Sequence, residues 1–218
     1  MCGRFTLLAE ELEILKAFGI EHHIEDYTPR YNIAPGQKIL AVVSDGEKRR
    51  AGFLKWGLVP NWAKDPKIGY KMINARAESA ADKPSFKRLM ERRRCLIVAD
   101  SFYEWKKDGD KKQPLRISLK DRELFAFAGL WDRWTQGEEE LVTCTILTRE
   151  PNEFMANIHN RMPVILPKNM EQEWIDPERK DPQYMRDFVL SLPNEQLEAY
   201  EVSTFVNSAK NEGEQCIV

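Results

Sequence analysis

The chain has 218 residues, of which 42% are hydrophobic and 31% charged, with 33 Lys+Arg against 35 Asp+Glu. This size is typical of one globular domain with a sizeable core, so we expect residues 1–218 to form a single domain. No apolar run approaches the roughly 20 residues of a membrane helix, and no apolar segment follows the first Met. Membrane insertion and secretion are therefore not expected, and we predict a cytoplasmic protein.

Cysteine usage excludes two further classes of protein. The four cysteines, at positions 2, 95, 144 and 216, have no metal-ligand spacing and are too few for a disulfide scaffold. The three His residues add no zinc-ligand pattern. We therefore predict no metal and no cofactor.

Helix and strand signals follow one another along the chain. Residues 7–18 have helical periodicity, with Thr6 as the expected N-cap and Gly19 as the expected stop. Residues 38–43 and 51–58 read as two strands around a turn. A second hairpin is expected from residues 95–105 to 114–117, around the turn at Asp108-Gly109-Asp110.

The second half of the chain continues the mixture. Further strands are expected at residues 124–130, 141–147 and 199–203, and helices at 86–94, 150–158, 168–175 and 182–192. Strands dominate the middle and helices the flanks, without regular alternation. We therefore predict an α+β fold with a strongly curved, mostly antiparallel sheet rather than a doubly wound fold.

Charge is segregated along the chain. Residues 48–122 hold 21 Lys+Arg and 9 Asp+Glu, so the remainder of the chain is strongly acidic. Aromatic residues occur throughout this basic segment, a composition typical of proteins that neutralise phosphates and stack on unpaired bases. The alternative is a solvated basic face above an aromatic core. The aromatic residues are Trp56, Trp62, Tyr70, Phe86, Tyr103 and Trp105.

Cys2 has the most distinctive chemistry. Its small side chain favours removal of the initiator Met, which leaves a free α-amine and a free thiol on adjacent carbons. The amine can condense with an aldehyde to an imine, and the thiol can then close onto the imine carbon to give a thiazolidine. The alternative is an incidental Cys at a disordered start. Gly3, which permits close approach to a ligand, and the helix expected soon after favour an ordered, exposed aminothiol.

Other residues form candidates for binding and proton transfer. Asn74 is suited to a hydroxyl or carbonyl group and Arg76 to a phosphate, although a turn and a surface ion pair explain them equally well. Glu104 is a carboxyl group inside an aromatic strand, which fits general acid–base catalysis or a buried structural ion pair. His159 precedes a Pro-marked break and is either a satisfied structural residue or a catalyst.

Ordered motifs along most of the chain resemble the SRAP family, the SOS response-associated peptidase domain. The resemblance extends from residue 1 to about residue 211. The motifs are Met1-Cys2-Gly3-Arg4-Phe5, Arg30-Tyr31-Asn32-Ile33-Ala34-Pro35, Trp56-Gly57-Leu58-Val59-Pro60, Asn74-Ala75-Arg76-Ala77-Glu78, Phe102-Tyr103-Glu104-Trp105 and Ile158-His159-Asn160-Arg161-Met162-Pro163.

The resemblance implies a barrel-like fold and a sensor of abasic sites in single-stranded DNA. Cys2 would be the nucleophile that crosslinks to the ring-opened sugar. The resemblance also implies a cysteine autopeptidase-like activity that removes Met1, since some members cleave off their own N-terminal extension or initiator residue. Glu104 would move protons near the Cys2 amine, and His159 would assist ring opening. Asn74 would hold the chain start and the lesion in register.

The resemblance also implies a set of DNA contacts. Phosphates are assigned to Arg4, Arg76 and Arg161, stacking on a base to Trp105, and further DNA contacts to Asn32, Trp56 and Trp62. Where the family often has another cation after the Asn-Ala-Arg motif, this chain has Lys83, Lys87 and Arg88, so the contacting residue is open. Abasic single-stranded DNA and the replication machinery are the expected partners, and we expect a monomer.

Two other functions remain open at this point. A mature Cys-Gly start also occurs in N-terminal nucleophile glutamine amidotransferases, which predicts release of ammonia from glutamine. A non-covalent binder of single-stranded nucleic acid predicts salt-sensitive binding that does not depend on Cys2.

Overall fold

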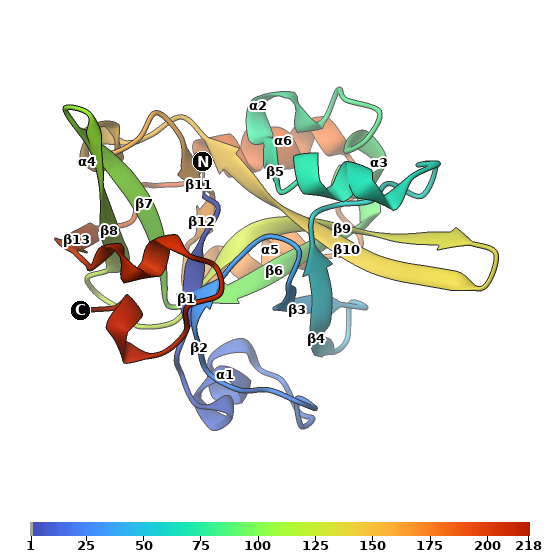
Figure 1. Ribbon diagram of the computed structural model, residues 1–218. Coiled ribbons are helices and arrows are strands. Elements are labelled where there is room, and N and C mark those ends of the chain that lie inside the picture. The colour runs from blue at the N-terminus through green and yellow to red at the C-terminus, as the bar shows by residue number, and fades with distance from the viewer. Residues whose placement is uncertain (1) are drawn as a thin grey trace.

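The computed structural model describes residues 2–218, and two sheets form its centre (Figure 1). In the larger sheet β9 and β10 also pair with each other, which closes five strands into a barrel in the order β10, β4, β3, β6, β9. This sheet contains β3 (Lys38–Ser44), β4 (Arg49–Trp56), β5 (Asn74–Arg76), β6 (Arg94–Ala99), β9 (Phe125–Gln136), β10 (Glu139–Arg149), β11 (Met162–Pro163) and β12 (Ile165–Leu166).

The smaller sheet has the strand order β13-β8-β7-β1-β2 and is antiparallel throughout. Its strands are β1 (Phe5–Leu7), β2 (Arg30–Ile33), β7 (Ser101–Asp108), β8 (Lys111–Leu119) and β13 (Leu197–Glu201). In the larger sheet only β4 and β5 run parallel to a neighbour, which is β10 in both cases. The predicted curved, mostly antiparallel, barrel-like α+β fold is confirmed.

Short helices surround the sheets. Figure 1 shows α2, α3 and α6 grouped beside one end of the β9–β10 pair, with α1 at the far side of the molecule. The α-helices are α1 (Glu11–Phe18), α2 (Ala77–Ala80), α3 (Lys87–Arg92), α4 (Glu153–Ala156), α5 (Glu171–Ile175) and α6 (Pro182–Ser191). The 3-10 helices are η1 (Pro66–Lys71), η2 (Lys168–Met170), η3 (Thr204–Asn207) and η4 (Glu214–Cys216). No helix in residues 2–218 is long and apolar enough to span a membrane.

The predicted start of the first helix is wrong. Thr6 lies inside β1 and does not cap a helix, because pairing with Ser101 on β7 fixes it in an extended strand. Helix α1 begins later, where Glu10 and Glu13 form a capping box. Its end is as predicted, since Gly19 has the left-handed φ of 64° that ends many helices.

The expected hairpin at residues 95–117 is two features. The chain leaves the barrel after β6, turns at Asp100, and enters the smaller sheet as β7, so only β7 and β8 form the hairpin. This crossing carries the strand with Glu104 out of the barrel and places it next to β1.

Aromatic packing fixes β1 against the barrel. Phe5 lies 5.3 Å from Trp56 and 5.8 Å from Phe127, measured between ring centroids, and all three side chains are fully buried. Burying one such ring contributes roughly 2–3 kcal/mol to stability. The position of residues 2–4 is thus set by the core and not by surface contacts.

Candidate active site

A cleft of about 890 Å³ opens where the start of the chain, the β7–β8 hairpin, the segment after α4 and η3 meet. Figure 1 shows these segments together on one side of the molecule. The cleft contains four cations and one carboxyl group. Its lining residues are Arg4, Glu104, Trp105, Lys106, Lys107, Lys112, Ala156, Asn157, Ile158, His159, Asn160 and Asn207.

Cys2 lies within electrostatic reach of Glu104. Phe5 pairs with Phe102 in the antiparallel register, and the Tyr103 N–H donates to the Arg4 carbonyl over 2.9 Å. Continued backwards, this register sets Gly3 opposite Glu104, one residue from Cys2. Burial and then the negative charge of Glu104 raise the pKa of the Cys2 thiol, so the thiol is protonated at neutral pH.

The expectation of an exposed aminothiol is corrected by the structure. The Cys2 side chain is 0% exposed and belongs to the same apolar core as Phe5. The physical reason is that β1 packs its start against the barrel. The predicted removal of Met1 concerns a residue outside those that the structure describes.

Glu104 is buried in the middle of β7, with 2% of its surface exposed, and it pairs across the hairpin with Leu115. Burying a carboxyl group costs free energy unless neighbouring groups compensate its charge or bond to it. Glu104 lines the cleft on one side and interacts electrostatically with the Cys2 thiol.

His159 lines the cleft from the loop after α4. Its backbone N–H donates to the Met155 carbonyl over 2.8 Å, and its Nδ1 accepts from the Arg161 backbone N–H over 3.1 Å. Because Nδ1 is an acceptor, the neutral ring carries its proton on Nε2. The imidazole is therefore held in the tautomer that donates through Nε2.

Asn74 lies at the start of β5, opposite Ile146 on β10, and is not among the residues that line the cleft. Its Nδ2 donates to the Ile146 carbonyl over 3.4 Å. Its Oδ1 is buried, and no donor within residues 2–218 reaches it. Leaving a buried acceptor unsatisfied costs about 1–3 kcal/mol, so a hydrogen-bond donor from a ligand would stabilise this oxygen.

Arg4 and Trp105 form one polar wall of the cleft. An Arg4 guanidinium nitrogen donates to Asn32 Oδ1 over 2.8 Å and to the Val206 carbonyl over 2.6 Å, and the guanidinium lies 5.6 Å from the Trp105 ring centroid. The Trp105 indole N–H donates to Asn207 Oδ1 over 2.7 Å. The segment around η3 thus holds both side chains in place.

Two of the expected DNA contacts are wrong. Trp56 is 0% exposed and its indole N–H donates to the Ile73 carbonyl, so it is a core residue and offers no ring to a base. Asn32 is also 0% exposed, and its amide nitrogen donates to the carbonyls of Ser208 and Asn211. Of the two, only Asn32 touches a residue of the cleft, since its Oδ1 accepts from Arg4.

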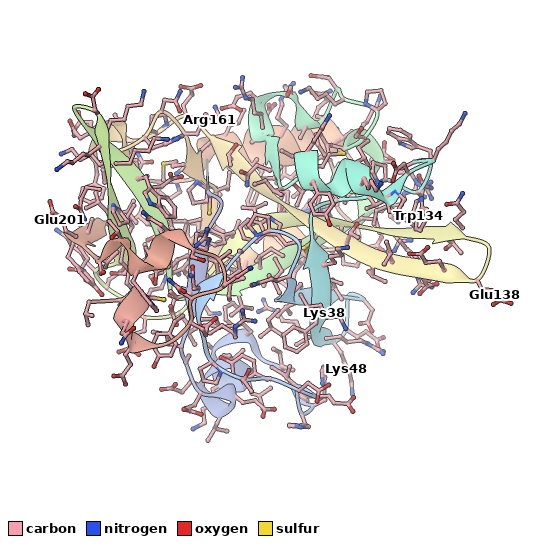
Figure 2. All side chains as sticks on the ribbon, in the orientation of Figure 1. Lys38, Lys48, Trp134, Glu138, Arg161 and Glu201 are labelled. Carbon is pink, nitrogen blue, oxygen red and sulfur yellow. The ribbon has the colours of Figure 1, made fainter. Side chains whose placement is uncertain are left out.

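Arg161 is also largely buried, and its guanidinium donates to both oxygens of Glu78 over 2.8 Å and to Glu150 over 3.0 Å. Figure 2 labels it on the cleft side of the molecule. A phosphate would have to displace one of these carboxylates, so its DNA contact stays a prediction. The contacts expected of Arg76 and Trp62 also stay predictions. Arg76 is exposed, and 57% of the Trp62 surface is accessible.

Sequence reasoning missed part of the cleft. Lys106, Lys107 and Lys112 line it around the hairpin turn, and their spacing about an Asp-Gly turn beside Glu104 was an available signal. No local pattern pointed to Asn207, because it meets Trp105 only through the fold.

Known proteins match this chain along its length. The family model described as SOS response associated peptidase (SRAP) matches residues 1–209. The abasic site processing protein YoqW of Bacillus subtilis is 51% identical over 221 residues, covering 100% of this chain and 99% of the relative. The abasic site processing protein HMCES of Gallus gallus is 34% identical, covering 88% of this chain and 66% of the relative.

A solved structure shows the same fold. The crystal structure of a protein from Bacteroides thetaiotaomicron superposes with a TM-score of 0.87, covering 99% of this chain and 98% of that chain at 23% identity.

Proposed function

The chain belongs to the SRAP family, and from this premise we propose that it processes abasic sites in single-stranded DNA by bonding covalently to them through Cys2. The observation that supports this proposal is the β1–β7 register, which brings the chain start to Glu104 at the edge of a cationic cleft. Relatives named abasic site processing proteins agree with the substrate.

The covalent step starts with the amine. Hydrolysis of the bond between residues 1 and 2 frees the Cys2 α-amine, which attacks the C1′ aldehyde of the ring-opened sugar and loses water to give an imine. The protonated thiol then adds its sulfur to the imine carbon while its proton goes to the imine nitrogen, closing a thiazolidine. Holding both groups on one residue makes this second step unimolecular.

Glu104 and His159 divide the proton transfers. The raised pKa of the Cys2 thiol means that a neighbouring base must assist as sulfur attacks, so Glu104 takes the thiol proton and passes it to the imine nitrogen. His159 donates from Nε2 to the sugar ring oxygen and so promotes opening of the ring to the aldehyde. Asn74 accepts a hydrogen bond through its buried Oδ1 from the amine or the lesion.

Binding is sequence-independent. Arg4 and the lysines 106, 107 and 112 neutralise phosphates along the cleft, while the Trp105 ring stacks on a base next to the lesion. An abasic nucleotide has no base to pair or stack, so it leaves a helix at low cost. Affinity then comes from charge, and specificity for the lesion from the covalent bond.

The test is the mass of the protein after incubation with a fresh abasic single-stranded oligonucleotide. We expect a denaturant-stable adduct of one DNA per chain, without Met1, and complete loss of the adduct in Cys2→Ala. Cys216→Ala, which removes another buried cysteine, is the matched control and should react normally. An adduct that survives Cys2→Ala, or none with the unaltered chain, contradicts the proposal.

A further inference from the structure

Four arginines lie near one another at the end of the molecule opposite the cleft. This arginine patch consists of Arg88 and Arg92 on α3, Arg93 just after it, and Arg133 on β9, and the Arg93 guanidinium lies over the ring of Trp131. Figure 1 shows α3 beside the β9–β10 hairpin, and Figure 2 labels Trp134 and Glu138 along the same hairpin. None of the patch residues lines the cleft.

Arg93 shows how closely the charges are packed. Its guanidinium lies 4.2 Å from the Trp131 ring centroid, and its backbone carbonyl accepts from the Trp131 backbone N–H over 2.9 Å. Burial lowers the pKa of Arg93, Asp132 opposes this, and the positive charges of Arg133, Arg88 and Arg92 lower the pKa further. The positive charges of Arg88, Arg92 and Arg133 thus all reach the Arg93 guanidinium.

Neighbouring carboxylates offset the charge of the patch only in part, since Asp132, Glu91 and Glu140 stand against four arginines. The two oxygens of Asp132 accept from the backbone N–H groups of Asn61 and Arg133, each over 2.9 Å. Glu91 lies 3.5 Å from Arg92, and Glu140 lies 3.7 Å from Arg133.

The arginines of these two pairs stay open to solvent. The side chain of Arg92 is 58% exposed and that of Arg133 is 56% exposed. Such exposed pairs contribute less than about 1 kcal/mol, so their guanidinium groups remain available to an external anion. Like charges held together at a cost to the protein suit a ligand that carries several negative charges.

A basic loop adjoins the patch. The backbone of residue 61 is held by Asp132, and the Trp134 indole N–H donates to the Ala63 carbonyl over 2.7 Å. These bonds fix residues 61 and 63 beside β9, the strand that carries Arg133. The loop contains Lys64, Lys67 and Lys71 and the exposed ring of Trp62. Patch and loop together make a cationic surface that extends well beyond the cleft.

We propose that the arginine patch binds the sugar–phosphate backbone of DNA outside the lesion site, as a second, sequence-independent contact. The inference rests on the proposed function, because a strand held in the cleft supplies flanking phosphates. Guanidinium forks bind phosphate oxygens in pairs, and arginine stacked on an aromatic ring is already oriented for this contact. An acidic protein segment is the competing occupant.

The test compares two double variants that remove the same charge. Arg92→Ser with Arg133→Ser alters the patch. Lys48→Ser with Lys180→Ser is the control, because these exposed lysines also form ion pairs, each at 3.6 Å, but lie elsewhere. For both variants, binding to a long intact single-stranded oligonucleotide is measured over a range of salt concentrations. The rate of adduct formation is measured with an abasic oligonucleotide of about 6 nucleotides, which fills only the cleft.

We expect the patch variant to lose about 1.4 from the slope of log affinity against log salt, since each phosphate contact contributes about 0.7 for single strands. At 0.1 M salt this corresponds to roughly 10- to 30-fold weaker binding of the long strand. Its adduct rate on the short oligonucleotide should equal that of the control.

Long-strand binding equal to the control overturns the inference and leaves an acidic protein as the occupant. An equal loss on both oligonucleotides also overturns it, because the effect then passes through the cleft or the fold. The intact strand cannot form an adduct, so this measurement stands even if the proposed covalent chemistry fails.

Discussion

Glu104 and Glu171 are both buried glutamates, but their surroundings differ. Glu171 is 0% exposed, and its Oε2 lies 2.7 Å from Lys168 Nζ and 3.5 Å from an Arg49 guanidinium nitrogen. Both cations also donate to backbone carbonyls at the end of α1, those of Ala17 and Phe18. The two cations neutralise the Glu171 carboxylate, and the cluster joins α1, β4 and α5.

Glu104 lies instead beside a thiol at a cleft. Burial of a carboxyl group therefore does not by itself mark a reaction site, since both glutamates are buried. The two differ in what their carboxyl groups contact. Glu171 is paired with internal cations, whereas Glu104 lies near a thiol that must lose a proton. Substitution of the two glutamates by the isosteric Gln turns this comparison into measurements.

The largest expected difference is in adduct formation. Glu104→Gln should slow bonding to abasic single-stranded DNA by about 100-fold or more, the range in which general acid–base groups contribute. Glu171→Gln should change the rate by no more than about twofold, since its carboxylate is remote from the cleft. Single-turnover gels at saturating DNA measure both rates, and equal rates in the two variants would break the distinction.

The order reverses for stability. Glu171→Gln leaves Lys168 and Arg49 with no carboxylate partner and should lower the free energy of unfolding by about 2 kcal/mol, less than a fully buried pair because Lys168 is half exposed. Glu104→Gln should change it by less than about 1 kcal/mol. Urea denaturation of both variants at neutral pH decides, and a greater loss for Glu104→Gln would assign it a structural role.

The smallest effect sharpens the role of Glu104. Its negative charge raises the pKa of the Cys2 thiol, so Glu104→Gln should lower that pKa and increase the ionised fraction at any pH below it. Mass spectrometry of alkylated peptides across pH measures this shift. The Cys95 peptide is the internal control, since burial alone raises the pKa of Cys95.

This measurement also separates nucleophilicity from proton transfer. A variant whose thiol ionises more readily but forms adducts more slowly shows that Glu104 acts by moving protons. An unchanged alkylation profile would mean that its charge does not reach Cys2.

The sequence predicted the elements whose signals are local. Hairpin turns, the Gly19 stop of α1 and the helix at residues 182–192 follow from neighbouring residues, and so does the strand that holds Glu104. It failed for Thr6, where a pairing with β7 overrides the helical pattern of the residues that follow.

Residue types and their spacing are enough to identify the chemistries that the chain contains: a second-position Cys, a Glu inside an aromatic strand, a His before a Pro-marked break and a basic middle segment. Which of these groups meet depends on the folded structure. The fold buries Cys2 and Trp56, pairs Arg161 with Glu78, and brings Asn207 within hydrogen-bonding distance of Trp105. The physical reason is that burial and ion pairing depend on contacts between distant segments, which the closed barrel and the crossing from β6 to β7 impose.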